Sequence, residues 1–93
     1  MKQQTTLNLL HTIGKQIRHH RRRMSMSQLE LAAKVGIFRT YLSRIENGRA
    51  NPSIAVISNI AVQLNVDFQA LLIEIVDLPV DFSVNLSQFA VEF

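Results

Sequence analysis

The chain of 93 residues is 47% hydrophobic, which is enough for the core of one small domain and argues against disorder. It has no cysteine, which excludes a disulfide framework and a thiolate zinc site. Residues 1–52 hold ten basic and two acidic residues, a formal charge of +8, whereas residues 53–93 hold five acidic residues and no basic one, a charge of −5. This separation predicts that the first half binds a polyanion, and it favours nucleic acid over a membrane surface.

The sequence shows no secretory signal and no membrane-spanning segment. The start, MKQQTTLNLL, lacks the longer apolar region and the small-residue cleavage site of a signal. No apolar run reaches the length that a bilayer-spanning helix needs. We therefore expect a cytoplasmic protein that has no membrane partner.

An amphipathic helix is predicted from Leu7 to about Arg23. Apolar residues in this stretch recur at spacings of three and four, which is the period of a helix. The basic run RHHRRR, residues 18–23, therefore forms its last turns, where cations complement the helix dipole. Since the adjacent His19 and His20 diverge on a helix, we expect no metal site there.

Local signals mark both ends of the next two helices. Ser27, with Glu30 three residues later, has the spacing of a capping box and opens the first of them. Gly36 ends it, because glycine takes positive φ without strain. The second covers residues 39–46 and ends at the Asn-Gly pair 47–48, which is another positive-φ signal.

Two more helices are expected before residue 78. Pro52, in the first turn, starts a helix that runs to about Leu64, and Asn65 can close it in a left-handed conformation. Asp67 then caps a last helix over residues 68–76.

Residues 78–93 change to an alternating pattern, with opposite phases before and after the pair 87–88. This pattern predicts two short strands joined by a turn or one strand with a bulge, with a disordered tail as the alternative. An isolated hairpin is barely stable, so we expect the segment to pair or pack with something. We assign the following apolar residues of this region to a dimer interface: Ile73, Ile75, Val76, Phe82, Val84, Leu86, Phe89, Val91 and Phe93.

The window from Gln28 to Asn47 has the spacing of a helix-turn-helix. Ala32 is small enough for a close helix crossing, and Gly36 supplies positive φ at the connection. The apolar side chains expected to close the wedge between the helices are Leu31, Val35, Ile37, Leu42 and Ile45. The side chains on the solvent face of the later helix, which suit base edges in a major groove, are Arg39, Thr40, Ser43 and Arg44.

The chain from about Ile13 to Leu72 resembles the Cro/repressor-type helix-turn-helix domains (the xenobiotic-response-element family) of phage and bacterial regulators. The residues that carry the resemblance are IGKQIRHHRRRMSMSQLELAAKV, RTYLSRIENGRANPS and IAVQLNVDFQALL. It implies an all-α fold, a compact five-helix repressor-like DNA-binding domain that members use as dimers. We therefore expect this domain in residues 1–77, followed by a short C-terminal β-like dimerisation tail in residues 78–93.

The resemblance also implies roles for individual residues. Arg39, Thr40 and Arg44 match base-reading positions. Arg21 matches an arginine that pairs with the residue matched by Glu46, which joins the first helix to the third. The residues expected to contact the DNA backbone are Ser27, Gln28, Tyr41, Asn47, Arg49, Arg22 and Arg23. For Tyr41, packing beside the start of the second helix is an equal alternative. Arg18 is expected to be solvated or to face a phosphate.

Three positions depart from the family pattern. His20 stands where leucine is usual, and we expect a partly buried neutral imidazole, with a pH-sensitive packing point as the alternative. Phe38 replaces the usual Ser or Thr N-cap, and we expect it to pack on the turn rather than to touch the sugar-phosphate edge. Ser25 replaces a frequent glycine, which predicts a mildly strained turn.

Together these features predict a sequence-specific DNA-binding transcriptional regulator, a repressor from a bacterium or phage that binds a near-palindromic operator as a homodimer. It would need no cofactor or metal and would be associated with the nucleoid when bound. The alternative is an antitoxin of a toxin–antitoxin pair, or a restriction–modification controller protein, with the C-terminal tail binding a partner protein. No serine or threonine has a plausible base beside it and no glycine-rich phosphate loop is present, so we expect no catalytic residues.

Overall fold

The structure, a computed structural model, describes the backbone of residues 2–73 and the side chains from residue 8 onward within that range. The elements in chain order are α1 (Lys2–Arg23), α2 (Gln28–Val35), α3 (Arg39–Glu46), α4 (Ile54–Gln63) and the 3-10 helix η1 (Phe68–Leu72). The predicted all-α class is confirmed for this part of the chain. None of the described helices has the length and apolar character that crossing a bilayer requires.

The predicted β-like tail, residues 78–93, lies outside the described residues, as does the expected domain boundary after residue 77. The same holds for most of the predicted dimer interface, namely Ile75, Val76, Phe82, Val84, Leu86, Phe89, Val91 and Phe93. Of that set, the structure describes Ile73, whose side chain is 61% exposed.

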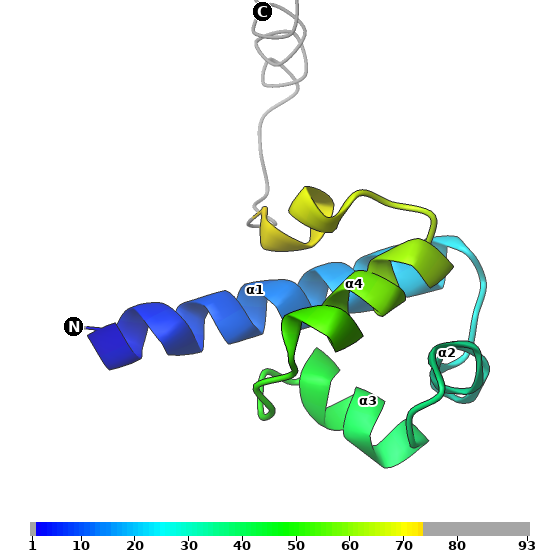
Figure 1. The fold of residues 1–93 in the computed structure, drawn as a ribbon, viewed down its shortest axis with the longest axis horizontal. Coiled ribbons are helices and arrows are strands. Elements are labelled where there is room, and N and C mark those ends of the chain that lie inside the picture. The colour runs from blue at the N-terminus through cyan, green and yellow to red at the C-terminus, as the bar shows by residue number, and fades with distance from the viewer. Residues whose placement is uncertain (1, 74–93) are drawn as a thin grey trace, which may run out of the picture.

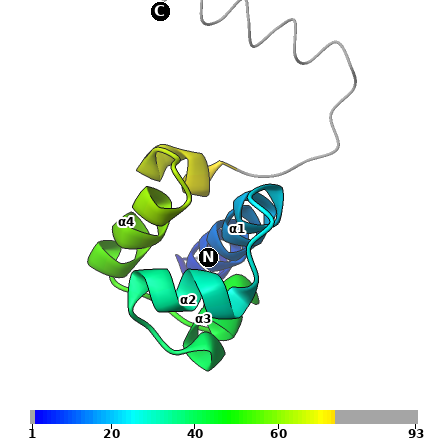
Figure 2. The same ribbon diagram turned by 90° about the vertical axis from the view of Figure 1, so that its right-hand side faces the viewer.

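The helices pack around the C-terminal half of α1, whose N-terminal half extends away from the rest (Figure 1). α1 contacts α3 and η1, whereas α4 contacts α2 and η1. Figure 2 shows α4 beside α1, with α2 and α3 below the pair and η1 above it. The helix pair α2–α3 therefore lies at the end of the bundle opposite to η1.

One aliphatic core holds these helices together. The wedge residues Leu31, Leu42 and Ile45 are fully buried, as predicted, and each such side chain stabilises the fold by about 1.5–3 kcal/mol. Val35 and Ile37 are only partly buried and pack against the core from its edge. The complete core is Ile13, Ile17, Met26, Leu31, Ala32, Leu42, Ile45, Ala50, Ile57, Ile60, Ala61, Leu64 and Leu71.

α1 and α3 come into backbone contact at Gly14. A Cβ atom at this position would lie 2.5 Å from the carbonyl oxygens of both Ile45 and Glu46. Real Cβ contacts are essentially never that short, so only glycine allows the two helices to approach this closely. This contact brings the last turn of α3 against the middle of α1.

The turns between helices follow the predicted signals. Gly36, at φ 84°, closes α2, and Gly48, at φ 71°, follows α3. Ser25 and Asn65 take φ values of 56° and 57°, which confirms the strained turn after α1 and the left-handed residue after α4. The side-chain amide of Asn59 adds a bond of 3.1 Å to the Val35 carbonyl oxygen, which secures the end of α2 against α4.

Two helix starts differ from the prediction. α1 begins at Lys2 rather than at Leu7. The prediction that Pro52 lies in the first turn of the fourth helix is wrong, because Ser53 is its N-cap. The Ser53 hydroxyl oxygen accepts the Val56 N–H at 3.2 Å, so α4 begins at Ile54 and Pro52 stays outside it.

The fifth helix is shorter than predicted. η1 is a 3-10 helix of five residues, and Asp67 at its start makes no side-chain capping bond. Ile73, directly after η1, is extended at φ −88° and ψ 129°. The buried side-chain amide of Gln16 in α1 donates to the Ile73 carbonyl oxygen. We attribute the early end to the hydrogen bond that holds Ile73 to α1, which the local sequence does not reveal.

Candidate nucleic-acid interface

The capping box at the start of α2 fixes the first half of the helix-turn-helix. The Ser27 hydroxyl oxygen accepts the Glu30 N–H at 3.0 Å, and the Glu30 carboxylate accepts the Ser27 N–H at 3.1 Å. Backbone and hydroxyl hydrogen bonds from Ser27 lower the pKa of the Glu30 carboxyl group. The first helical residue, Gln28, is therefore held in a defined position at the surface.

α3 presents most of its predicted base-reading residues to solvent. Arg39, Thr40 and Arg44 are exposed, whereas Ser43 is half-buried. The Arg44 guanidinium donates from Nη2 to the Arg49 carbonyl oxygen at 3.2 Å. Two arginines and a threonine thus lie on the free side of a helix whose other side is anchored in the core.

The carboxylate of Glu46, at the end of α3, is the centre of a buried hydrogen-bond network. Arg21 donates to it from Nε at 2.7 Å and from Nη2 at 3.0 Å, which is the two-pronged ion pair that the family resemblance implied. The third Arg21 nitrogen, Nη1, donates to the Met26 carbonyl oxygen at 2.9 Å. Gln28 Nε2 donates to Glu46 at 3.1 Å, and Arg18 Nε makes a longer contact of 3.4 Å.

This environment keeps the carboxylate ionised. Burial by itself raises the pKa of Glu46, but the hydrogen bonds and charge of Arg21, followed by the bonds of Gln28 and Arg18, outweigh it. The pKa therefore lies below the ordinary value for a glutamate. Among the described residues, every buried side-chain nitrogen and oxygen has a hydrogen-bond partner.

The Glu46 network reaches residues at both ends of α3. The side-chain oxygen of Gln28, Oε1, accepts a contact of 3.4 Å from Nη1 of Arg39, at the start of the helix. Arg18 Nη2 donates to the Asn47 side-chain oxygen at 2.8 Å, just beyond its end. One carboxylate thus helps to position a predicted base-reading residue and a predicted backbone contact.

Arg18 belongs to this network, which differs from the prediction made from the sequence. It was expected to be solvated or phosphate-facing, whereas the structure joins it to Glu46 and Asn47. A signal was present, because residues three apart share one face of a helix and Arg18 precedes Arg21 by three. Gln28 was expected at the DNA backbone, and its amide is half-buried and partly used within the chain.

The remaining predicted backbone contacts divide into two groups. Exposed side chains belong to Arg22, Arg23, Ser27, Asn47 and Arg49. Tyr41 is half-buried and packs against the core, which favours the packing alternative for this residue.

The histidine at position 20 is partly buried, as expected. Burial, followed by the charges of His19 and Arg23, lowers its pKa, which favours the neutral imidazole. The rings of His19 and His20 meet edge to face, with centroids 5.1 Å apart.

Comparison with known proteins agrees with this geometry. A profile of the family described as "Helix-turn-helix" matches residues 17–71. The chain belongs to the helix-turn-helix family.

Its helix-turn-helix relatives include phage and bacterial regulators. The ImmF control region 10 kDa protein of Bacillus phage phi105 is 42% identical over 59 residues, which span 63% of this chain and 66% of the phage protein. The SinR transcriptional regulator of Bacillus subtilis is 40% identical over 63 residues, which span 67% of this chain and 57% of SinR. The chain thus spans about two thirds or less of the length of these relatives.

A solved helix-turn-helix structure has a similar fold. The restriction–modification controller protein C.AhdI from Aeromonas hydrophila superposes with a TM-score of 0.65 at 31% identity, covering 67% of this chain and 94% of that protein.

Phe38 departs from the common helix-turn-helix pattern, and its surroundings differ from our expectation. It occupies the N-cap position of α3 without a side-chain capping bond, as predicted. The predicted packing on the turn is wrong, because the side chain is 83% exposed. The wedge between the helices is already closed by other buried side chains, so the ring of Phe38 stays at the surface.

Replacing Phe38 with serine is expected to raise the free energy of unfolding by about 1 kcal/mol, since a hydroxyl oxygen would accept an unpaired N–H at the start of α3. Urea denaturation measures the change. Phe38→Ala is the matched control, because it removes the same exposed ring without supplying an acceptor. The prediction fails if the serine variant is no more stable than the alanine variant.

Proposed function

We propose that this chain is a sequence-specific DNA-binding transcriptional regulator, a repressor that binds a near-palindromic operator as a homodimer. The observation that carries the proposal is the free side of α3, where Arg39, Thr40 and Arg44 are exposed while the opposite side is buried. A helix of this kind fits the major groove of B-DNA.

The chemistry of this surface suits base recognition. An arginine guanidinium donates two hydrogen bonds to O6 and N7 of guanine, and the methyl group of a threonine contacts that of thymine. Each good bidentate pair discriminates against the wrong base by about 1–3 kcal/mol. Asn47 and Arg49, beyond the end of α3, are exposed, which suits the phosphate contacts that we propose for them.

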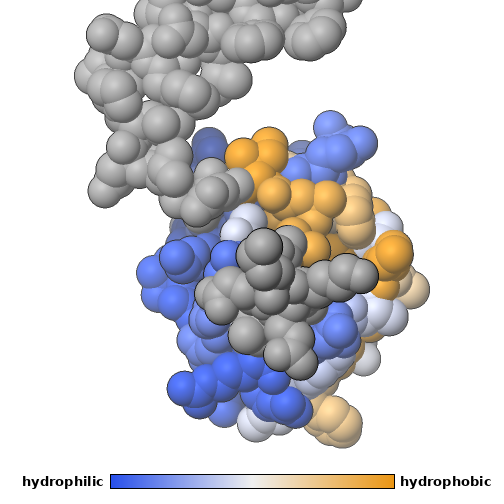
Figure 3. All heavy atoms as spheres, turned by 90° about the vertical axis from the view of Figure 1, so that its left-hand side faces the viewer, coloured by the Kyte–Doolittle hydropathy of each residue, from blue (hydrophilic) through white to orange (hydrophobic). Residues whose placement is uncertain are grey.

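Apolar surface on the other end of the bundle supports the dimer. Val62, Leu72 and Ile73 are 68%, 39% and 61% exposed. Figure 3 shows hydrophobic side chains gathered where η1 and α4 lie, whereas hydrophilic side chains cover the lower left of the view. A hollow of about 710 Å³ beside Ile73 is lined by residues of α4, η1 and their connection. A dimer that reads two half-sites one helical turn apart needs its two α3 helices about 34 Å apart on one face of the duplex.

Relatives support the same assignment. SinR has been solved in complex with DNA, and that structure superposes with a TM-score of 0.61 at 39% identity, covering 66% of this chain and 98% of that one. The similarity to C.AhdI favours a restriction–modification controller as the second candidate. A restriction gene beside the gene for this chain would favour the controller over a repressor.

Arg39→Ala or Arg44→Ala is expected to weaken binding to the preferred operator by about 1–3 kcal/mol and binding to random DNA much less, because base contacts are lost. The operator comes from selection on random duplexes with the full chain, and sedimentation gives the stoichiometry of the bound species. Lys34→Ala, which removes an exposed charge from the end of α2, is the control. Equal losses on operator and random DNA would mean that α3 contacts only the backbone.

A further inference from the structure

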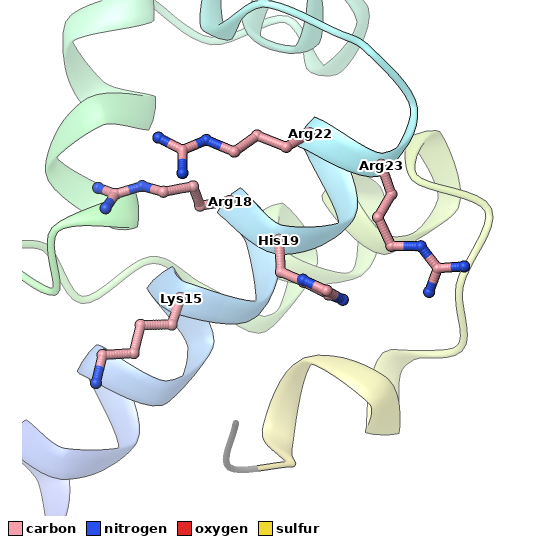
Figure 4. A pocket seen from close by; sticks show the side chains of 5 residues that line it. All are labelled: Lys15, Arg18, His19, Arg22 and Arg23. Carbon is pink, nitrogen blue, oxygen red and sulfur yellow. The ribbon is translucent and has the colours of Figure 1, made fainter. Parts of the chain in front are cut away.

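A row of basic side chains lines one hollow on α1. The hollow has a volume of about 370 Å³, and Figure 4 shows its side chains along successive turns of the helix. The row spans the nine residues from Lys15 to Arg23. The distance from the first to the last is about 12 Å along the helix, at 1.5 Å per residue. We call this surface the α1 basic face, and its residues are Lys15, Arg18, His19, Arg22 and Arg23.

Helix stability alone does not account for this surface. Arg22 and Arg23 lie in the last turn of α1, where cations complement the helix dipole. That effect is confined to the last turn, so it does not explain Lys15. The spacing of Arg18 and Arg22 puts two like charges on neighbouring turns, which destabilises a helix. Among the described residues, Arg18 is the member of the face with a carboxylate partner, Glu46.

The α1 basic face borders the predicted DNA-contacting surface. Arg18 and Arg22 point from α1 toward α3 (Figure 4). Arg18 donates to the side chain of Asn47 at 2.8 Å and shares the Glu46 carboxylate with Gln28. Asn47 and Gln28 are expected to contact phosphates at the two ends of the helix-turn-helix. The face therefore continues that surface along α1.

We propose that the α1 basic face binds the sugar-phosphate backbone of the duplex outside the base pairs that α3 reads. This inference rests on the proposed function. A duplex carries one negative charge per about 1.7 Å of its axis, so a face about 12 Å long meets several phosphates. A lysine acts as a point charge without a preferred base, so the contribution of Lys15 is independent of sequence.

An acidic peptide is the competing occupant. Residues 74–93 carry four acidic residues and no basic one, and they follow Ile73, which Gln16 ties to α1. Geometry favours DNA, because Arg18 of the face donates to Asn47 and shares the Glu46 carboxylate with Gln28. The two occupants predict opposite changes in DNA affinity when a charge is removed from the face. Removal weakens DNA binding if the face contacts DNA, and strengthens it if the face holds an acidic segment that competes with DNA.

The decisive variant is Lys15→Gln, with Lys34→Gln as a matched control that removes the same charge from an exposed site on α2. Binding of the full chain to the selected operator and to a random duplex is measured over a range of salt concentrations. We expect Lys15→Gln to lower both affinities by a similar factor, roughly eightfold at 0.1 M salt, and to reduce the slope of log K against log salt by about 0.9. Lys34→Gln should leave affinities and slopes unchanged.

Three outcomes overturn the inference. If Lys15→Gln leaves affinity and slope unchanged while Arg44→Ala still weakens operator binding, the α1 basic face does not contact DNA, although the proposed function stands. If Lys15→Gln increases affinity, the face binds residues 74–93 instead. If the wild-type chain prefers no duplex over scrambled competitor, the proposed function fails together with this inference.

Discussion

Replacing Glu46 with alanine is expected to lower the free energy of unfolding by about 3–5 kcal/mol, because it leaves the buried Arg21 guanidinium without its ionic partner. Glu46 is 2% exposed and Arg21 is 8% exposed, so water does not replace the lost bonds. The variant also removes the acceptor that Gln28 and Arg18 share. Urea denaturation at pH 7 measures the change.

Glu30→Ala is the control for this experiment, because it removes a carboxylate from an exposed site on the neighbouring helix. It should destabilise the protein much less than Glu46→Ala does. Comparable losses in the two variants would show that the Glu46 network contributes little beyond a surface charge.

The pH dependence of stability gives the same test a second readout. The pKa of Glu46 is lowered in the folded chain, so its contribution is complete above about 4.5, the ordinary value, and is lost as the pH falls through the folded-state pKa. The wild type should therefore lose stability in acid. Glu46→Gln, which cannot ionise, should lose less over the same interval.

Gly14→Ala is the second large effect that we expect, a loss of about 1–3 kcal/mol in the free energy of unfolding. At an exposed helical site the same change would stabilise the fold by about 1 kcal/mol. Here the new methyl carbon would lie 2.5 Å from two carbonyl oxygens of α3, and backbone atoms cannot rotate away as a side chain can. The cost of separating α1 from α3 therefore outweighs the gain in helix propensity.

Ala33→Gly measures the propensity term by itself, because Ala33 is exposed in the middle of α2. It should cost about 1 kcal/mol in thermal or urea unfolding. If Gly14→Ala leaves the free energy of unfolding unchanged or raises it, as the helix propensity measured at Ala33 alone would predict, then α1 and α3 do not approach as closely in solution as the structure indicates.

Much of the fold could be predicted from signals that act within a few residues. A hydroxyl group three residues before its N–H partner caps α2, and a glycine at positive φ ends it, whatever the rest of the chain does. The helix-turn-helix and its exposed residues on α3 follow from such signals together with the helical period. The predicted start of α4 is wrong because Pro52 and Ser53 are both typical of a helix start. In the structure the hydroxyl of Ser53 caps the helix.

The parts that could not be predicted depend on residues far apart in the chain. Arg18 reaches Asn47, and Gln16 reaches Ile73, the residue that follows η1. The exposure of Phe38 also follows from which side chains already fill the wedge.

By itself, the sequence determined the helix-turn-helix, the caps of α2 and the charge of the basic first half, because each depends on neighbouring residues or on composition. The tertiary structure decided how the ends of α3 are held and how closely α1 approaches it. Such contacts exist only after distant segments pack, because the geometry of a hydrogen bond or a steric clash is set by the relative position of two helices.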